Sequence, residues 1–294
     1  MSIEKFVDEF MRSRNATPLE DFEGFSAIEM YQILHHPFGN QCPIILNSEI
    51  DSGILETSPI LKILRHLFSE SYNSGGIQLT ATGNLNRKLI IEIYEKRYLP
   101  DEHIDNGIVK LRSEKDWICL HGVHIVLKLA GFMRKRNNKL TLSQKRKVQF
   151  EKGKMSEIFF EFLQAYTTRF NWGYNDLYEN DQIGQMGFLY LMYLFQKYGN
   201  DFRDLRYYCN LYYRAFPLLY MDDNLSGGFK YGKSENIVNI RFVERFAKWF
   251  GFVESRERKN DQFRYQKEVK LRVTELLSNL LIIRRQQGIQ KEHT

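Results

Sequence analysis

Apolar residues recur at spacings of three and four along most of the chain, which is the pattern of amphipathic α-helices. The clearest case begins at Pro59, because Ser58 is a favourable cap residue and proline is favoured at the first position of a helix. We expect this helix to extend to about residue 70. The same pattern predicts further helices over residues 3–13, 26–34, 86–98, 117–130, 155–197, 237–250 and 274–281, and one that begins near Ser143.

A glycine marks the place where one predicted helix ends and a β-hairpin begins. Gly131 follows the apolar helix over residues 117–130, and two short apolar and basic stretches then enclose Asn137 and Asn138. Because Asn tolerates the positive backbone angles of a tight turn, residues 132–142 predict a two-stranded hairpin.

The same order of elements returns nearer the C-terminus. Gly251 ends the helix over residues 237–250, and strands are predicted near residues 252–253 and 269–273, with a turn at 259–261. The order of helix, glycine, hairpin and helix therefore occurs twice, roughly 120 residues apart.

These two repeats predict a mainly α-helical protein of the α+β class with two modules, each carrying a small β-hairpin. We expect four parts: an N-terminal helical extension over residues 1–52, a first module over 53–150, connecting buried helices over 151–200, and a second module with a C-terminal helix over 201–294. The connecting part contains the run MGFLYLMYLF, which is apolar on every side and therefore typical of a buried helix.

Three segments carry a resemblance to known families. LAGFMRKRNNKLTLSQ and WFGFVES…VKLRVTELL resemble the third helix, wing and following turn of the winged-helix fold, a compact variant of the helix-turn-helix. SPILKILRHLF…GGIQLTATGNLNRKL is similar to a segment of a group of bacterial proteins, some of which carry SEC-C zinc motifs. This chain lacks the Cys/His cluster of those members, so no zinc site is carried over. The resemblance implies two winged-helix-like modules, with a wing that lies along a phosphate backbone.

Composition and hydropathy narrow the class of protein further. Hydrophobic residues make up 43% of the chain and charged residues 27%, which excludes fibrous, disordered and disulfide-scaffold proteins. The longest apolar run, Gly187 to Phe195, covers about 14 Å as a helix, whereas a bilayer core needs about 30 Å. The N-terminus does not follow the signal-peptide pattern, and the three scattered cysteines have no CxxC spacing. We expect a cytoplasmic protein that does not enter a membrane.

Positive charge is concentrated in and just after the first hairpin. Residues 134–154 hold nine basic residues and one acidic residue, a net charge of +8, whereas the whole chain carries +6. We predict that this surface contacts the phosphates of DNA. The predicted contact residues are Arg134, Lys135, Arg136, Lys139, Lys145, Arg146 and Lys147. A second interpretation stays open, in which the cations are a solvated face that keeps the edge strands from pairing with other chains.

Sequence-specific recognition would require Arg, Lys, Asn or Gln on the exposed face of a helix. Beyond its first turn, the helix over residues 117–130 offers only His121, His124 and Lys128 as polar side chains. The corresponding helix of the second module offers Asn239, Arg241, Arg245 and Lys248. We therefore expect backbone contacts in the first module, and we assign any base reading to Arg241, Arg245 and Lys248 in the second.

No pattern in the sequence indicates catalysis or a cofactor. No nucleophile and base, and no pair of carboxylates, stand at a spacing typical of an active site. His121 and His124 are three residues apart on one helix, which would suit two ligands of a metal, but no third ligand follows at a plausible spacing. We expect a non-enzymatic, regulatory nucleic-acid-binding protein that holds no metal or cofactor.

The alternative is a protein-interaction module that uses winged-helix folds as docking surfaces. The dense aromatic run from Tyr207 to Tyr220 suits either a partly wet core or a protein interface, and its spacing favours the core. A homodimer is a partner that the winged-helix resemblance implies.

Overall fold

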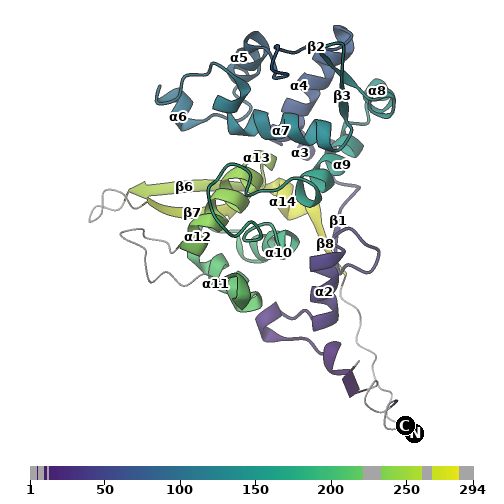
Figure 1. The fold of residues 1–294 in the computed structure, drawn as a ribbon. Coiled ribbons are helices and arrows are strands. Elements are labelled where there is room, and N and C mark those ends of the chain that lie inside the picture. The colour runs from purple at the N-terminus through teal and green to yellow at the C-terminus, as the bar shows by residue number, and fades with distance from the viewer. Residues whose placement is uncertain (1–4, 6–9, 12, 221–232, 260–266, 285–294) are drawn as a thin grey trace. The chain divides into compact units, whose positions relative to one another are not determined.

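The computed structural model describes residues 5, 10–11, 13–220, 233–259 and 267–284. Helices predominate in it, and the strands form three small sheets (Figure 1). This confirms the predicted mixture of helix and strand. The chain divides into two compact units: the first unit comprises residues 51–174 and 244–252, and the second unit comprises residues 1–50, 175–243 and 253–294. The four-part division predicted from the sequence stays a prediction.

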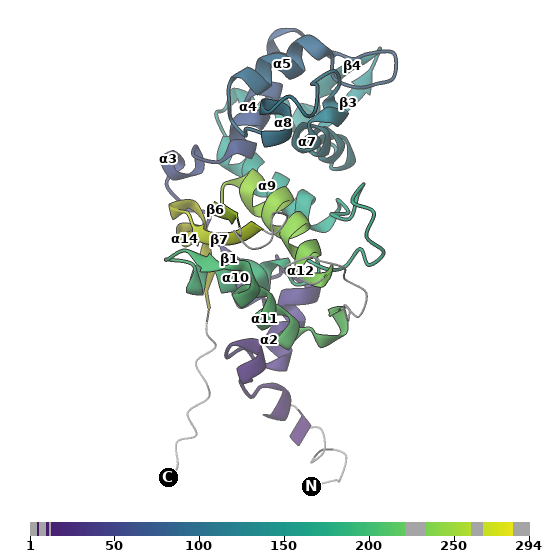
Figure 2. The ribbon, with the colours of Figure 1, turned by 90° about the vertical axis from the view of Figure 1, so that its left-hand side faces the viewer.

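The first unit is built largely from helices around one sheet (Figures 1 and 2). Its elements are α3 (Ser52–Leu55), α4 (Pro59–Asn73), β2 (Ile77–Gln78), α5 (Arg87–Glu95), α6 (Glu102–Asp105), η2 (Glu114–Asp116), α7 (Ile118–Leu129), β3 (Met133–Arg136), β4 (Lys139–Leu142), α8 (Gln144–Glu151), α9 (Met155–Thr168) and α13 (Lys248–Phe250). Helix α4 begins as predicted, because the Ser58 hydroxyl accepts a hydrogen bond from the amide of Leu61 and Pro59 occupies the first position.

The sheet of the first unit has the order β2-β4-β3, and both pairs of neighbours are antiparallel. It is joined to the end of α7 by Gly131, whose φ of +69° is the left-handed conformation that glycine adopts without strain. The amide of Phe132 donates to the carbonyl of Leu127, which completes the helix end. Phe132, Met133 and Leu140 are buried, so the hairpin is anchored to the core at its base.

The second unit contains η1 (Glu20–Phe22), α2 (Ala27–His35), β1 (Ile44–Leu46), α10 (Phe188–Tyr198), β5 (Arg203–Asp204), α11 (Leu205–Ala215), η3 (Pro217–Leu219), α12 (Lys233–Val238), β6 (Val253–Lys259), β7 (Lys267–Val273), α14 (Glu275–Leu280) and β8 (Leu281–Ile283). Helix α10 is buried at every position from Phe188 to Phe195, as its uniformly apolar sequence predicts. The π-helix η4 (Asn239–Ala247) connects α12 to α13.

Two sheets form in the second unit, with the orders β5-β7-β6 and β1-β8, and their pairs are antiparallel. Strands β6 and β7 follow Gly251, whose φ of +78° repeats the left-handed helix end of Gly131. In the β2-β4-β3 sheet of the first unit and in the β5-β7-β6 sheet of the second, a two-residue strand pairs with the second strand of the hairpin. The repeated order of helix, glycine and hairpin is therefore confirmed.

The predicted helix over residues 155–197 is interrupted. Between α9 and α10, residues 169–187 contain no helix. Their side chains compete with helical hydrogen bonding, because the carboxamide oxygen of Asn171, the carboxylate of Asp176 and the carboxamide oxygen of Asn180 each accept from the amide two residues further on. Gly184 and Gly187 also adopt positive φ angles.

Two predicted features lie wholly or partly outside the described residues. The N-terminal helix over residues 3–13 is mostly outside them, and the turn over 259–261 is described only at Lys259. Among the helices of the described part, none combines the length and hydrophobicity that crossing a bilayer requires.

Candidate functional site

The β3–β4 hairpin is closed by the two-residue turn that its sequence predicts. Asn137 and Asn138 have φ angles of +48° and +56°, which match the twist of a tight antiparallel hairpin. Across the strands, Arg134 faces Thr141, Lys135 faces Leu140 and Arg136 faces Lys139.

Three cations share the outer face of this hairpin. Residues directly opposite each other, and residues two apart on one strand, point to the same side of a sheet, so Arg134, Arg136 and Lys139 lie together. Both arginines are exposed and Lys139 is half-buried. Lys135, also exposed, belongs to the opposite face with the buried Leu140.

Within the part of the chain that the structure describes, no carboxylate forms an ion pair with Arg134, Lys135, Arg136 or Lys139. Arg136 and Lys139 moreover carry like charges at directly opposite positions, an arrangement that destabilises a sheet. The outer face of the hairpin therefore holds a concentrated positive charge that the neighbouring described side chains do not neutralise.

The three basic residues of α8 have different environments. The Lys145 ammonium lies 2.8 Å from Glu161 Oε2, and the Arg146 guanidinium lies 2.5 Å from the same oxygen. Arg146 is buried, with its guanidinium 3.7 Å from the centre of the Phe132 ring. Lys147 is exposed and lies 5.6 Å from the ring centre of Tyr72. Arg146 is therefore a structural residue at the base of the hairpin.

Glu161 is held ionised by these contacts. Burial raises the pKa of its carboxyl group, but hydrogen bonds from Arg146, Lys145 and Gln149 outweigh burial and lower this pKa to about 2. A carboxylate that is ionised at neutral pH thus offsets two of the predicted phosphate contacts, Lys145 and Arg146, and leaves the hairpin itself uncompensated.

The basic residues predicted for base reading are engaged within the protein. Arg241 is fully buried, and its guanidinium bonds the Asp176 carboxylate at 2.5 and 3.1 Å and the Ile183 carbonyl at 3.2 Å. Arg245 donates to the Tyr174 carbonyl at 2.9 Å, and Lys248 bonds Glu244 one helical turn away. Because Arg241 is buried, it does not lie on an exposed helix face.

Helix α7, which precedes the basic hairpin, is covered along most of its length. Of its twelve residues, only Lys128 and Leu129 are exposed. A Cβ atom at Gly122 would lie 3.2 Å from the Trp249 ring, so this ring packs closely against the helix. The helix has no exposed face with which to read base edges.

Glu114, which the sequence did not single out, explains the two histidines of α7. Its buried carboxylate lies 3.0 Å from Nδ1 of His121 and 2.9 Å from Nδ1 of His124, and it accepts the Leu85 amide at 2.7 Å. Burial raises the pKa of Glu114, but these hydrogen bonds lower it to about 2. Glu114 lies in η2, before α7 begins, so the helical spacing of the histidines does not point to it.

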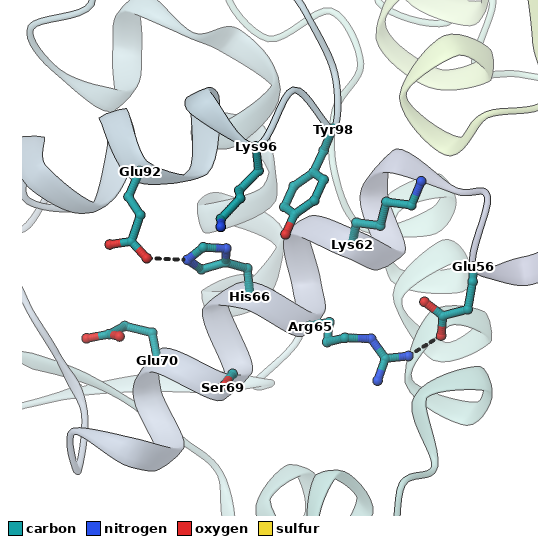
Figure 3. A pocket seen from close by; sticks show the side chains of 9 residues that line it. All are labelled: Glu56, Lys62, Arg65, His66, Ser69, Glu70, Glu92, Lys96 and Tyr98. Atoms are coloured by element: carbon teal, nitrogen blue, oxygen red, sulfur yellow. Dashed lines mark hydrogen bonds and ion pairs between the residues drawn. The ribbon is translucent and has the colours of Figure 1, made fainter.

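A cleft between α4 and α5 is a second candidate site that the sequence did not indicate (Figure 3). Its volume is about 400 Å³, and it is lined by Glu56, Lys62, Arg65, His66, Ser69, Glu70, Glu92, Lys96 and Tyr98. Arg65 is paired with Glu56, and His66 Nε2 lies 3.2 Å from Glu92 Oε1. Three acidic and three basic side chains thus surround one polar hollow.

The tyrosine run and the possible metal ligands lie in ordinary structural surroundings. Tyr208, Tyr212 and Tyr213 are buried in the second unit, so most of the tyrosine run packs in its core, whereas Tyr220 is exposed. Among the described residues, no three His, Cys, Asp or Glu side chains are arranged to hold a metal ion.

Comparison with known proteins identifies one similarity. Residues 56–154 match the family model of the Y4jL N-terminal domain. Neither the curated proteins nor the solved structures gave a match. The matched segment spans about a third of the chain and contains the cleft, α7, the basic hairpin and α8. This part of the chain, and with it both candidate sites, is therefore similar to the Y4jL N-terminal domain.

Proposed function

We propose that the protein binds DNA through the outer face of the β3–β4 hairpin, by contacts to phosphates, in a non-enzymatic role. The observation that carries this proposal is the group of Arg134, Arg136 and Lys139 on one face without a carboxylate partner in the described chain. Such a face gains free energy from an external polyanion, because binding releases the counterions of the phosphates. Lys135, on the opposite face of the hairpin, and Lys147, in α8, are also exposed and add positive charge near it in the sequence.

A winged-helix-like arrangement is part of the proposal. The order α4, β2, α5, α7, β3, β4 in the first unit is the order of helices, strand and wing in that fold. The order α10, β5, α11, the run from α12 to α13, β6, β7 repeats it. In both, the short strand pairs with the second strand of the hairpin, which supports the assignment of each hairpin as a wing.

The mode of contact that this arrangement favours is independent of sequence. A winged helix usually reads bases through its third helix, and only the last two residues of α7 are exposed. Because Arg241 is also buried, the proposed interface contains the hairpin cations and excludes Arg146 and Arg241.

The test is binding to a duplex of random sequence, measured by fluorescence polarisation at two salt concentrations. Three phosphate contacts predict that affinity falls about 40-fold between roughly 50 and 200 mM salt. The triple variant Arg134→Glu, Arg136→Glu, Lys139→Glu should bind about 100-fold more weakly than the natural chain at low salt, and its binding should depend less on salt.

A matched triple variant controls for net charge. Lys88, Lys110 and Arg169 are exposed residues of the first unit that lie outside the hairpin, and their replacement by Glu changes the charge equally. This control should retain most of the affinity. If the hairpin variant binds as tightly as the control, the hairpin is not the nucleic-acid interface.

A further inference from the structure

The cleft between α4 and α5 has the size and lining of a site for a small, strongly polar molecule. Pockets for larger organic ligands are mostly apolar, whereas most of the side chains that line this one are charged. Its volume of about 400 Å³ accommodates a molecule the size of an amino acid. No residue of the basic hairpin lines it, so the inference is independent of the proposed function.

The charges in the cleft are only partly satisfied by one another. Arg65 is paired with Glu56, and His66 with Glu92. In the described chain, the ammonium groups of Lys62 and Lys96 and the carboxylate of Glu70 form no ion pair with another side chain. The cleft therefore keeps unpaired charge of both signs.

His66 contacts two other residues that line the cleft, Glu92 and Tyr98. Its side chain is 12% exposed, and its Nε2 atom lies 3.2 Å from Glu92 Oε1. The Tyr98 ring stands edge-on to the imidazole, with the ring centres 6.2 Å apart. Figure 3 shows Lys96 and Tyr98 extending toward His66, and it marks the contact of His66 with Glu92.

We propose that this cleft binds a small zwitterion that carries an ammonium and a carboxylate group, as a free α-amino acid does. The carboxylate would be held by Lys96 and the Tyr98 hydroxyl, and the ammonium by Glu70 with Glu92. A phosphate dianion fits less well, because three carboxylates line the cleft and Glu70 lacks a cationic partner in the described chain. A cationic amine alone would leave Lys96 uncompensated.

The test measures binding to the full chain by calorimetry and by the imidazole NMR signals of His66. The probes are the common L-α-amino acids one at a time, the N-acetyl and methyl ester derivatives of the tightest, and inorganic phosphate. We expect at least one amino acid to bind with a Kd of about 1 mM or below, and both derivatives to bind about tenfold more weakly.

Variants assign the binding to the cleft. Glu70→Gln and Lys96→Gln should each weaken binding about tenfold, because each removes one charge-assisted contact. Glu95→Gln and Lys88→Gln, on the exposed surface of α5 and outside the lining, should leave affinity unchanged. Unchanged thermal unfolding of all four establishes that they are folded. Binding of phosphate with no amino acid bound, absence of any binding, or equal affinity in the cleft and control variants would overturn the proposal.

Discussion

The two hairpins of this protein share an order of elements and differ in how their charges are used. In β6–β7, Arg272 is paired with Glu254 on the opposite strand at 2.6 Å. Arg256 lies 3.9 Å from the centre of the Phe202 ring, and Lys270 faces Asp204 across the sheet. In β3–β4, the described residues supply no such partners to the cations of the outer face.

A repeated backbone pattern therefore does not imply a repeated function. Each cation of the β6–β7 hairpin named above has an acidic or aromatic neighbour within its own unit, so an external anion would compete with a neighbour that is already present. The cations of the β3–β4 hairpin repel one another, and a bound anion would reduce this repulsion. The proposal of nucleic-acid binding therefore applies to the first hairpin alone.

The helices that precede the hairpins differ in a similar way. A buried carboxylate contacts each of these helices. Glu114 bonds His121 and His124 of α7, whereas Asp176 bonds the guanidinium of Arg241 in η4. A histidine can lose its charge when it loses its partner, and an arginine cannot. The two carboxylates should therefore contribute unequally to stability.

The largest loss of stability is expected for a substitution of Asp176. Asp176→Asn leaves a charged guanidinium buried and should lower the free energy of unfolding by about 3 to 5 kcal/mol. Glu114→Gln leaves imidazoles that can be neutral, and the expected loss is about 1 to 3 kcal/mol. The measurement is the urea dependence of the far-ultraviolet circular dichroism.

Asp181→Asn is the control for Asp176, because Asp181 is exposed on the same loop. This control should change the free energy of unfolding by less than about 0.5 kcal/mol. Equal losses in Asp176→Asn and Glu114→Gln would contradict the distinction between the two helices.

Lowering the pH should gradually remove the contribution of Glu114 to the stability of the folded chain. Its pKa is about 2 in the folded chain and 4.5 ordinarily, so the ionised carboxylate stabilises the folded state. This contribution, about 3 kcal/mol, is complete above the ordinary pKa and is lost as the pH falls through the folded pKa. The difference in stability between the natural chain and Glu114→Gln should therefore shrink between about pH 5 and pH 2. A constant difference over that range would show that Glu114 does not titrate with folding.

The sequence predicted those features that depend on a few neighbouring residues. Ser58 and Pro59 predicted the start of α4, and Gly131, Asn137 and Asn138 predicted a helix end and a turn, because each acts through its own backbone conformation. The sharing of one face by Arg134, Arg136 and Lys139 follows directly from strand alternation once the turn is known.

Features that depend on residues distant in the sequence were not predictable. The sequence predicted Arg241 on an exposed helix face. In the structure it is buried and bonds Asp176, which lies 65 positions earlier in the chain. The cleft needs α4 and α5 to lie together, and neither helix shows that in its own pattern. The break over residues 169–187 depends on local hydrogen bonds of Asn and Asp that override an otherwise helical spacing.

The last prediction concerns the two glycines that end the helices. Gly131 and Gly251 have nearly the same φ, but a Cβ atom at Gly131 would meet nothing within 4 Å, whereas one at Gly251 would lie 2.9 Å from the Pro59 ring. Gly131→Ala should cost about 1 to 2 kcal/mol through the backbone alone. Gly251→Ala adds a steric clash with a residue fixed at the start of α4, for a loss of about 2 to 4 kcal/mol. Urea unfolding measures both. Asn tolerates the left-handed conformation, so Gly131→Asn should recover part of the loss and Gly251→Asn should not; recovery at both positions would mean that the contact with Pro59 contributes nothing.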